Sequence, residues 1–150
     1  MSLIVLLDSG PLGMVTNPRA SFANAKCNQW LEGLLIKGIE VAVPEIADYE
    51  VRRELLRANK ILGLTRLNAV KAQLDYLPLT TDIMLQAAQF WAQARQMGKP
   101  TASDTALDGD VILAAQSYSL SILGYNAVIA TTNVRHLSLF VKAEQWDAIN

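Results

Sequence analysis

Cysteine and histidine are almost absent from this 150-residue sequence, which contains only Cys27 and His136. Zinc sites are usually built from several cysteine and histidine side chains, so a site of that kind is effectively excluded. Any bound metal ion would need oxygen ligands. Because a lone cysteine cannot form an internal disulfide, we expect Cys27 to be a small core residue and the protein to be cytoplasmic.

Long apolar runs and a dominant charge are lacking as well. No uninterrupted apolar stretch reaches the roughly 18 residues that span a bilayer, and the N-terminal apolar run has no basic leader, so no membrane association is expected. The 13 basic and 14 acidic residues give a net charge of −1, so contact with a polyanion would need a local basic patch. Glycine and proline are sparse and 51% of residues are hydrophobic, which predicts one ordered domain over residues 1–150.

Short apolar runs alternate with helical patterns along the chain. Wholly apolar runs predict strands that are buried on both faces at residues 3–7 and 127–130, and a further short strand is expected at residues 39–43. Weaker strands are expected at residues 76–79 and 140–141. Apolar residues recur at helical spacing over residues 27–35, 45–60, 64–74, 83–94 and 111–122. The segments 10–18 and 101–107 are expected to be loops. This alternation predicts an α/β fold, a three-layer α/β/α sandwich with a short, mostly parallel sheet.

Carboxylates occur at three places where such a sheet would present them to a ligand. Asp8 follows the first strand, Glu50 lies on the helix after the second, and Asp108 and Asp110 are expected to open the helix before the last main strand. Three polar residues nearby could orient ligands or water: Ser9, Thr131 and Asn133. Ligands bind beyond the carboxyl ends of parallel strands, and gathered carboxylates favour Mg²⁺ or Mn²⁺. Such an ion can activate a water molecule for attack on a phosphodiester.

Each of these carboxylates also has a structural interpretation. Asp8 could cap the turn or the following helix, and Glu50 could be a solvated helix residue. Asp108 could be a helix N-cap, with Asp110 favourably placed in the first turn.

A basic patch adjoins the second acidic position. Residues 52–71 contain a single acidic residue, Glu54, and six basic ones: Arg52, Arg53, Arg57, Lys60, Arg66 and Lys71. On a helical wheel Arg53, Arg57 and Lys60 fall beside Glu50, and such a patch could bind an RNA backbone. An ordinary solvated helix face is the alternative.

In this order the segments resemble the PIN-domain family, and within it the VapC-type ribonuclease toxins of prokaryotic toxin–antitoxin pairs. The matching pieces are Asp8 after the first strand, Glu50 six positions past Pro44, Asp110 near a helix start, and the Thr131-to-Asn133 segment after the last main strand.

The resemblance implies a PIN-like domain that cleaves single-stranded RNA with Mg²⁺ or Mn²⁺, forms a homodimer and pairs with a VapB-like antitoxin. It assigns the catalytic, metal-binding core to Asp8, Glu50 and Asp110, with Asp108 as an additional ligand and Ser9, Thr131 and Asn133 in support. Glu45, Asp48 and Glu54 compete for the second position, and the six-residue spacing favours Glu50.

One position departs from the family pattern. Many members have an acidic residue three positions after the asparagine of the Thr-x-Asn motif, where this sequence has His136. Imidazole is a poor Mg²⁺ ligand, so we expect His136 to be structural or to contact phosphate. The departure keeps an alternative open, a catalytically weakened PIN-like module that acts through protein partners. A haloacid-dehalogenase-like phosphatase is disfavoured because Gly10 stands where that chemistry needs a second aspartate.

Overall fold

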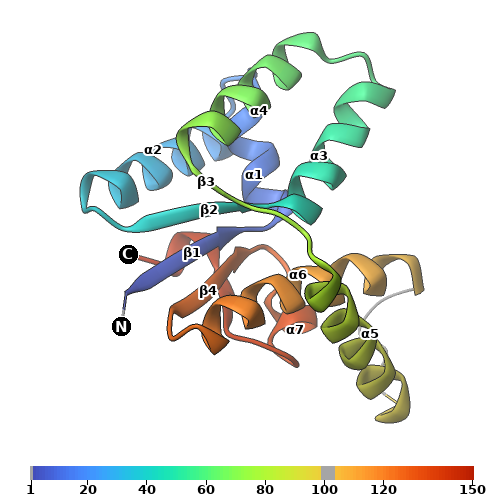
Figure 1. Ribbon diagram of the computed structural model, residues 1–150. Coiled ribbons are helices and arrows are strands. Elements are labelled where there is room, and N and C mark those ends of the chain that lie inside the picture. Colours follow the sequence, from blue (N-terminus) through green and yellow to red (C-terminus); the bar gives the residue numbers. More distant parts are fainter. Residues whose placement is uncertain (1, 99–103) are drawn as a thin grey trace.

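The computed structural model describes residues 2–98 and 104–150 of the chain. Strands and helices alternate through most of it (Figure 1). The strands are β1 (Leu3–Leu7), β2 (Glu40–Pro44), β3 (Asp75–Leu77), β4 (Asn126–Thr131) and β5 (Ala143–Gln145). The helices are α1 (Ser9–Thr16), α2 (Phe22–Ile36), α3 (Glu45–Arg57), α4 (Ile61–Gln73), α5 (Thr81–Gln96), α6 (Asp104–Ile122) and α7 (Val134–Leu137). A 3₁₀ turn, Trp146–Ala148, follows β5.

The five strands form one sheet in the order β3-β2-β1-β4-β5, and every pairing between them is parallel. The first strand therefore lies in the middle of the sheet, with Leu7 in register with Ala130 of β4. In Figure 1 helices α1, α2 and α4 lie on one side of this sheet, and α6 and α7 lie on the other. The predicted three-layer α/β/α sandwich is confirmed.

Side chains of the central strand alternate between two cores. Val5 and Leu7 pack with residues of α1, α2, α3 and α4 on one face of the sheet. Ile4 and Leu6 pack with residues of α6 and α7 on the other face. Because successive side chains of a strand point to opposite faces, a strand covered on both sides must be apolar throughout. This requirement explains why the run 3–7 contains no polar residue.

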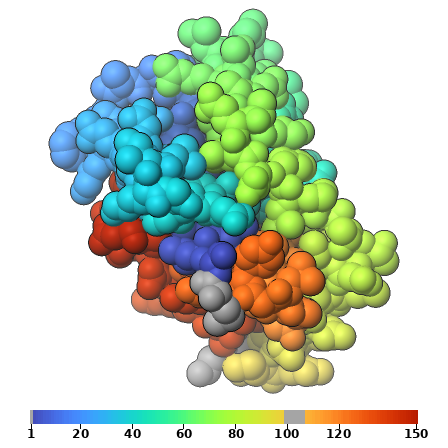
Figure 2. Space-filling view, turned by 60° about the vertical axis from the view of Figure 1, so that its left-hand side comes forward, coloured from blue at the N-terminus to red at the C-terminus, as the bar shows by residue number. Residues whose placement is uncertain are grey.

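The two ends of the sheet differ in character. The face in Figure 2 carries the start of β1, the connection from α2 to β2 and the end of α6. Large apolar side chains are exposed in these segments, including Ile36 and Leu123. Asp8 follows the opposite, carboxyl end of β1. The polar candidates therefore gather at the other end of the sheet.

Residues 9–16 form helix α1, so the loop expected at residues 10–18 is wrong for most of its length. Asp8 is the N-cap, and Leu12 donates the first helical hydrogen bond to its carbonyl oxygen. Pro11 lies in the first turn, where a backbone N–H has no helical partner, so its missing donor breaks no hydrogen bond. Gly10 approaches the loop after β4, and a Cβ atom there would lie 3.1 Å from Thr132 Oγ1.

Two other expected boundaries are wrong. Helix α6 begins at Asp104 and not at Asp108, so Asp108 and Asp110 lie inside the helix; residues 101–103 of the expected loop lie outside the described residues. The last strand covers Ala143–Gln145 and not residues 140–141. Among the described residues, no helix has the length and apolar character needed to cross a membrane.

Candidate functional site

Asp8 is fixed at the carboxyl end of the central strand by contacts to both of its carboxylate oxygens. The backbone N–H of Ser9 donates to Oδ1 at 2.7 Å, and the Thr131 hydroxyl donates to Oδ2 at 2.7 Å. Thr131 Oγ1 in turn accepts from the backbone N–H of Asn133 at 2.9 Å. Asp8 thus caps helix α1 as the structural interpretation expected, and it also faces the loop that follows β4.

Glu50 lies in the same region and belongs to α3, the helix that follows the neighbouring strand β2. Burial raises the pKa of its carboxyl, and the negative charges of Asp8 and Asp110 raise it further, while the Arg53 guanidinium lowers it. Its carboxylate packs against Gly109 of α6, where a Cβ atom would lie 2.6 Å from Glu50 Oε2. The absence of a side chain at Gly109 therefore leaves the space that the Glu50 carboxylate occupies.

Asp110 is the third carboxylate of this group and comes from the second turn of α6. Its Oδ2 atom is buried and has no hydrogen-bond partner among the described residues, although His136 Nδ1 lies 3.5 Å away. Burial raises the pKa of Asp110 from 3.8 to about 6; the nearby His136 lowers it and the charge of Asp8 raises it. His136 thus stands beside a predicted ligand.

The structure brings Asp8, Glu50 and Asp110 together from three separate elements. We call these three residues the acidic cluster. They are close enough that the charge of Asp8 raises the pKa of both Glu50 and Asp110, and the charge of Asp110 raises the pKa of Glu50. No group of three or more His, Cys, Asp or Glu side chains in the described part of the chain is arranged to hold a metal ion as it stands.

Asp108 is not brought to the acidic cluster, in contrast to its prediction as an additional ligand. Its side chain is exposed and lines a separate cavity of about 390 Å³ between α5 and α6, beside Trp91 and Val111. The reason is the early start of α6. Residues two positions apart in a helix point about 200° apart around its axis, so Asp108 and Asp110 point in nearly opposite directions.

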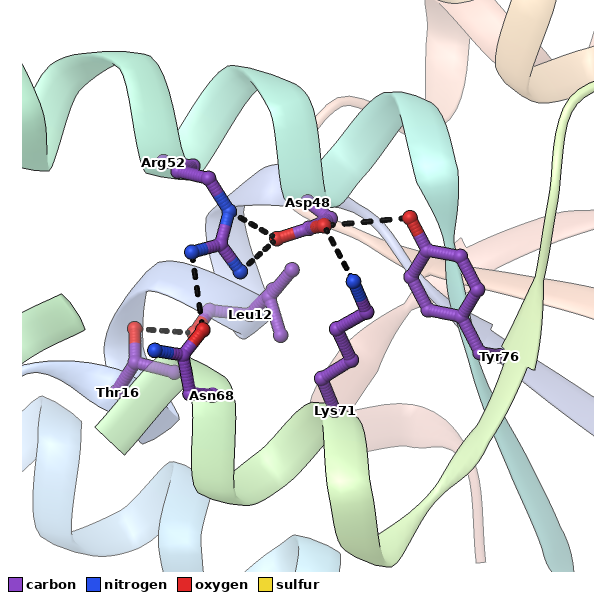
Figure 3. Close-up of polar contacts among 7 residues, drawn as sticks. All are labelled: Leu12, Thr16, Asp48, Arg52, Asn68, Lys71 and Tyr76. Atoms are coloured by element: carbon purple, nitrogen blue, oxygen red, sulfur yellow. Dashed lines mark hydrogen bonds and ion pairs between the residues drawn. The ribbon is translucent and has the colours of Figure 1, made fainter. Parts of the chain in front are cut away.

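Asp48, one of the competitors for the second acidic position, forms hydrogen bonds and ion pairs within a structural network (Figure 3). Its side chain is 8% exposed, and Oδ1 accepts from Arg52 Nε at 3.1 Å and Nη2 at 2.9 Å. Oδ2 accepts from the Tyr76 hydroxyl at 3.2 Å and lies 3.9 Å from Lys71 Nζ. Arg52 also donates to Asn68 Oδ1 at 2.9 Å. The network joins α3, α4 and β3 on the side of α3 away from the acidic cluster.

The other two competitors are also engaged elsewhere. Glu45 accepts from the backbone N–H of Leu79 at 2.7 Å, and Glu54 pairs with Arg57 at 2.9 Å. Of the four acidic residues of α3, Glu50 is the one whose pKa responds to Asp8 and Asp110. The geometry therefore agrees with the choice that the six-residue spacing favoured.

A groove of about 1030 Å³ adjoins the acidic cluster through Ser9 and Glu50. Its basic lining residues are Arg19, Arg53, Arg57 and Lys60. The predicted basic patch is therefore divided, since Arg52 and Lys71 neutralise Asp48 while Arg53, Arg57 and Lys60 border the groove. Arg19 was not among the sequence candidates, because it lies in the short connection between α1 and α2 and no periodicity marks it.

Metal-free protein should lose stability as the pH rises from about 4 to about 6. The raised pKa of Asp110 means that its protonated form is favoured in the folded state, so the stabilisation is complete below 3.8 and is lost as the pH passes about 6. Asp110→Asn should remove this dependence. As the pH rises across this range, the free energy of unfolding of the variant should therefore increase by about 2–3 kcal/mol relative to that of the wild type. Urea unfolding of both proteins in EDTA between pH 4 and pH 8 measures it. A constant difference between the two proteins would contradict the prediction.

Solved structures with the same arrangement are complexes of VapBC systems. VapBC2 from Rickettsia felis bound to a promoter DNA fragment matches with a TM-score of 0.73 and 16% identity, over 96% of this chain and 99% of the other. VapBC-1 from nontypeable Haemophilus influenzae matches with a TM-score of 0.69 and 15% identity. DNA-bound VapBC from Salmonella typhimurium matches with a TM-score of 0.63 and 18% identity. Each of these two matches covers 96% of this chain and 98% of the other. The chain has the VapC-type PIN-domain fold.

This PIN-domain fold is recognised from structure alone. No protein-family profile matches the sequence, and no curated protein matches it. Because the sequence identities are only 15–18%, the evidence for the shared fold is the three-dimensional likeness. This likeness extends over almost the whole length of both chains in each comparison.

Proposed function

We propose that this chain is a metal-dependent endoribonuclease that cleaves single-stranded RNA, the toxin of a type II toxin–antitoxin pair. The observation that carries the proposal is the convergence of Asp8, Glu50 and Asp110 beside a groove with basic walls. Carboxylates suit a hard cation, and a basic groove suits the phosphate backbone of RNA. The VapC-type fold is consistent with this activity.

The chemistry of the acidic cluster fits Mg²⁺ or Mn²⁺. The buried Oδ2 atom of Asp110 has no hydrogen-bond partner among the described residues, although the His136 imidazole lies 3.5 Å away. A bound cation would compensate for burying this carboxylate oxygen. Asp8, Glu50 and Asp110 would hold the ion. When bound, it supplies a polarised water molecule and neutralises charge on the phosphate.

The neighbouring residues hold the cluster in place. The Thr131 hydroxyl and the Ser9 backbone N–H fix the Asp8 carboxylate, and Asn133 anchors Thr131 through its own backbone N–H. Arg53 lowers the pKa of Glu50 and so favours its ionised form.

The proposal includes partners of the protein. VapBC complexes with this fold support a VapB-like antitoxin for this chain, in a cytoplasmic setting. We also propose a homodimer. Co-expression with the product of a small neighbouring gene, followed by purification and mass measurement, tests both assemblies.

Metal removal should abolish activity. Protein dialysed against EDTA should leave unstructured RNA intact, and added Mg²⁺ or Mn²⁺ should restore cleavage, because the three carboxylates need a cation to act on a phosphodiester. Gel analysis of the same RNA with and without metal measures this. Equal cleavage in EDTA and in Mn²⁺ would exclude the proposed chemistry.

The alternative is a catalytically weakened PIN-like module that acts through protein partners. Two observations favour this alternative. In the described part of the chain, no group of three or more acidic, histidine or cysteine side chains is arranged to hold a metal ion, and His136 lies 3.5 Å from Asp110. Calorimetric titration with Mn²⁺ separates the two functions. Heat of binding that disappears in Asp110→Asn supports the nuclease, and no binding at millimolar Mn²⁺ supports the alternative.

A further inference from the structure

An exposed aromatic side chain stands next to Glu50 on helix α3. Tyr49 is 55% exposed, and the guanidinium carbon of Arg53 lies over its ring at 5.1 Å from the centroid. Tyrosine offers a flat ring of large area, and an arginine stacked on one face fixes that ring and adds a delocalised positive plane. We call Tyr49 and Arg53 the stacked pair.

Arg53 of the stacked pair borders the acidic cluster. Arg53 lines the groove together with Ser9 and Glu50, and its charge acts on the Glu50 carboxyl. Tyr49 is four residues before Arg53 and is therefore its neighbour on the same side of the helix. A strand of RNA lying in the groove would pass Arg53, and Tyr49 is the ring on which that side chain stacks.

None of the described residues that line the groove is aromatic, so neither the groove nor the acidic cluster offers a ring on which a base can stack. The walls of the groove contribute arginine and lysine, which bind phosphates, and the cluster contributes carboxylates. Proteins that hold single strands combine such basic grooves with aromatic rings on which bases stack. Tyr49 is the aromatic residue that adjoins Glu50 in sequence, and a core role does not account for its exposure.

We propose that the stacked pair is a nucleobase-binding subsite, in which a base of single-stranded RNA stacks on the ring of Tyr49 while Arg53 supports the ring and contacts the adjoining phosphate. The inference rests on the proposed ribonuclease function and deepens it. Stacking tolerates every base, so the subsite selects unpaired nucleotides and not a particular sequence.

The test measures binding in EDTA, where no cleavage occurs. The probes are an eight-nucleotide oligoadenylate carrying one 2-aminopurine, and a chain of equal length with abasic riboses. Wild-type protein should bind the first about tenfold more tightly than the second, and stacking should quench the 2-aminopurine fluorescence. Tyr49→Ala should lose both effects without a change in binding of the abasic chain. Tyr49→Phe should keep both effects.

Tyr125→Ala is the matched control, since Tyr125 is also exposed but precedes β4 at the opposite end of the sheet. It should bind both probes as the wild type does. The inference is overturned if Tyr49→Ala retains the preference for bases, if wild type binds both chains equally, or if it binds neither.

The outcome is separable from the proposed function. If base-dependent binding requires Tyr49 but no metal supports cleavage, the ribonuclease proposal fails and the subsite stands. If cleavage occurs and Tyr49→Ala leaves the binding preference unchanged, the subsite fails and the ribonuclease stands.

Discussion

Asp8→Asn and Asp110→Asn should each lower RNA cleavage by at least about 100-fold. Both replacements keep the size of the side chain and remove its charge, so a cation loses an anionic ligand. Changes to residues that only orient metal ligands already cost 10- to 100-fold, so losing a ligand itself should cost more. Initial rates on a labelled single-stranded RNA in Mn²⁺ measure the effect.

Asp108→Asn provides the control for this prediction. It makes the same chemical change on the same helix, two residues from Asp110, but its side chain lines the cavity between α5 and α6. Cleavage by Asp108→Asn should equal that of the wild type. If Asp108→Asn and Asp110→Asn lost activity alike, the placement of the acidic cluster would be wrong.

Asp48→Ala should lower the free energy of unfolding by about 3–5 kcal/mol, because it breaks a buried ion-pair network by removing one partner. The Asp48 carboxylate is 8% exposed and satisfies Arg52, the Tyr76 hydroxyl and the nearby Lys71 at once. Without it, the partly buried Arg52 would lose its anionic partner. Equilibrium unfolding in urea, monitored by circular dichroism, gives the difference.

Glu54→Ala is the control on the same helix. Glu54 pairs with Arg57 at the surface, with side chains 61% and 71% exposed, and exposed pairs contribute about 0–1 kcal/mol. The variant should therefore unfold within about 1 kcal/mol of the wild type. A loss for Asp48→Ala no larger than that for Glu54→Ala would mean that the network does not stabilise the joint between α3, α4 and β3.

The central sheet could be predicted because its strands are buried on both faces. Such strands must be apolar at every position, and the runs ending at Leu7 and Ala130 stand out for that reason. Helix α1 could not be read in the same way. Its Gly10 and Pro11 are typical of loops, and they are tolerated because they occupy a first turn whose N–H groups have no helical partners.

The candidate site was predictable in part for a similar reason. Asp8 follows a clear strand and could be located from that feature, whereas Glu50 was indicated by the family resemblance, through its spacing from Pro44. Asp108 was misplaced because the start of α6 has no signal as clear as its apolar stripe. Inside the helix, Asp108 and Asp110 are two positions apart and therefore point in nearly opposite directions. The role of Arg19 in the groove depends on tertiary packing alone.

Gly109 is a position at which the proposed activity could be lost in evolution without loss of the fold. An added methyl group would meet the Glu50 carboxylate, which is the movable end of a long side chain. The carboxylate could swing aside at little cost in packing, but it would leave its place beside Asp8 and Asp110. A single codon change at Gly109 would thus separate the fold from the proposed metal site, because the chain would still fold while the Glu50 carboxylate left its place.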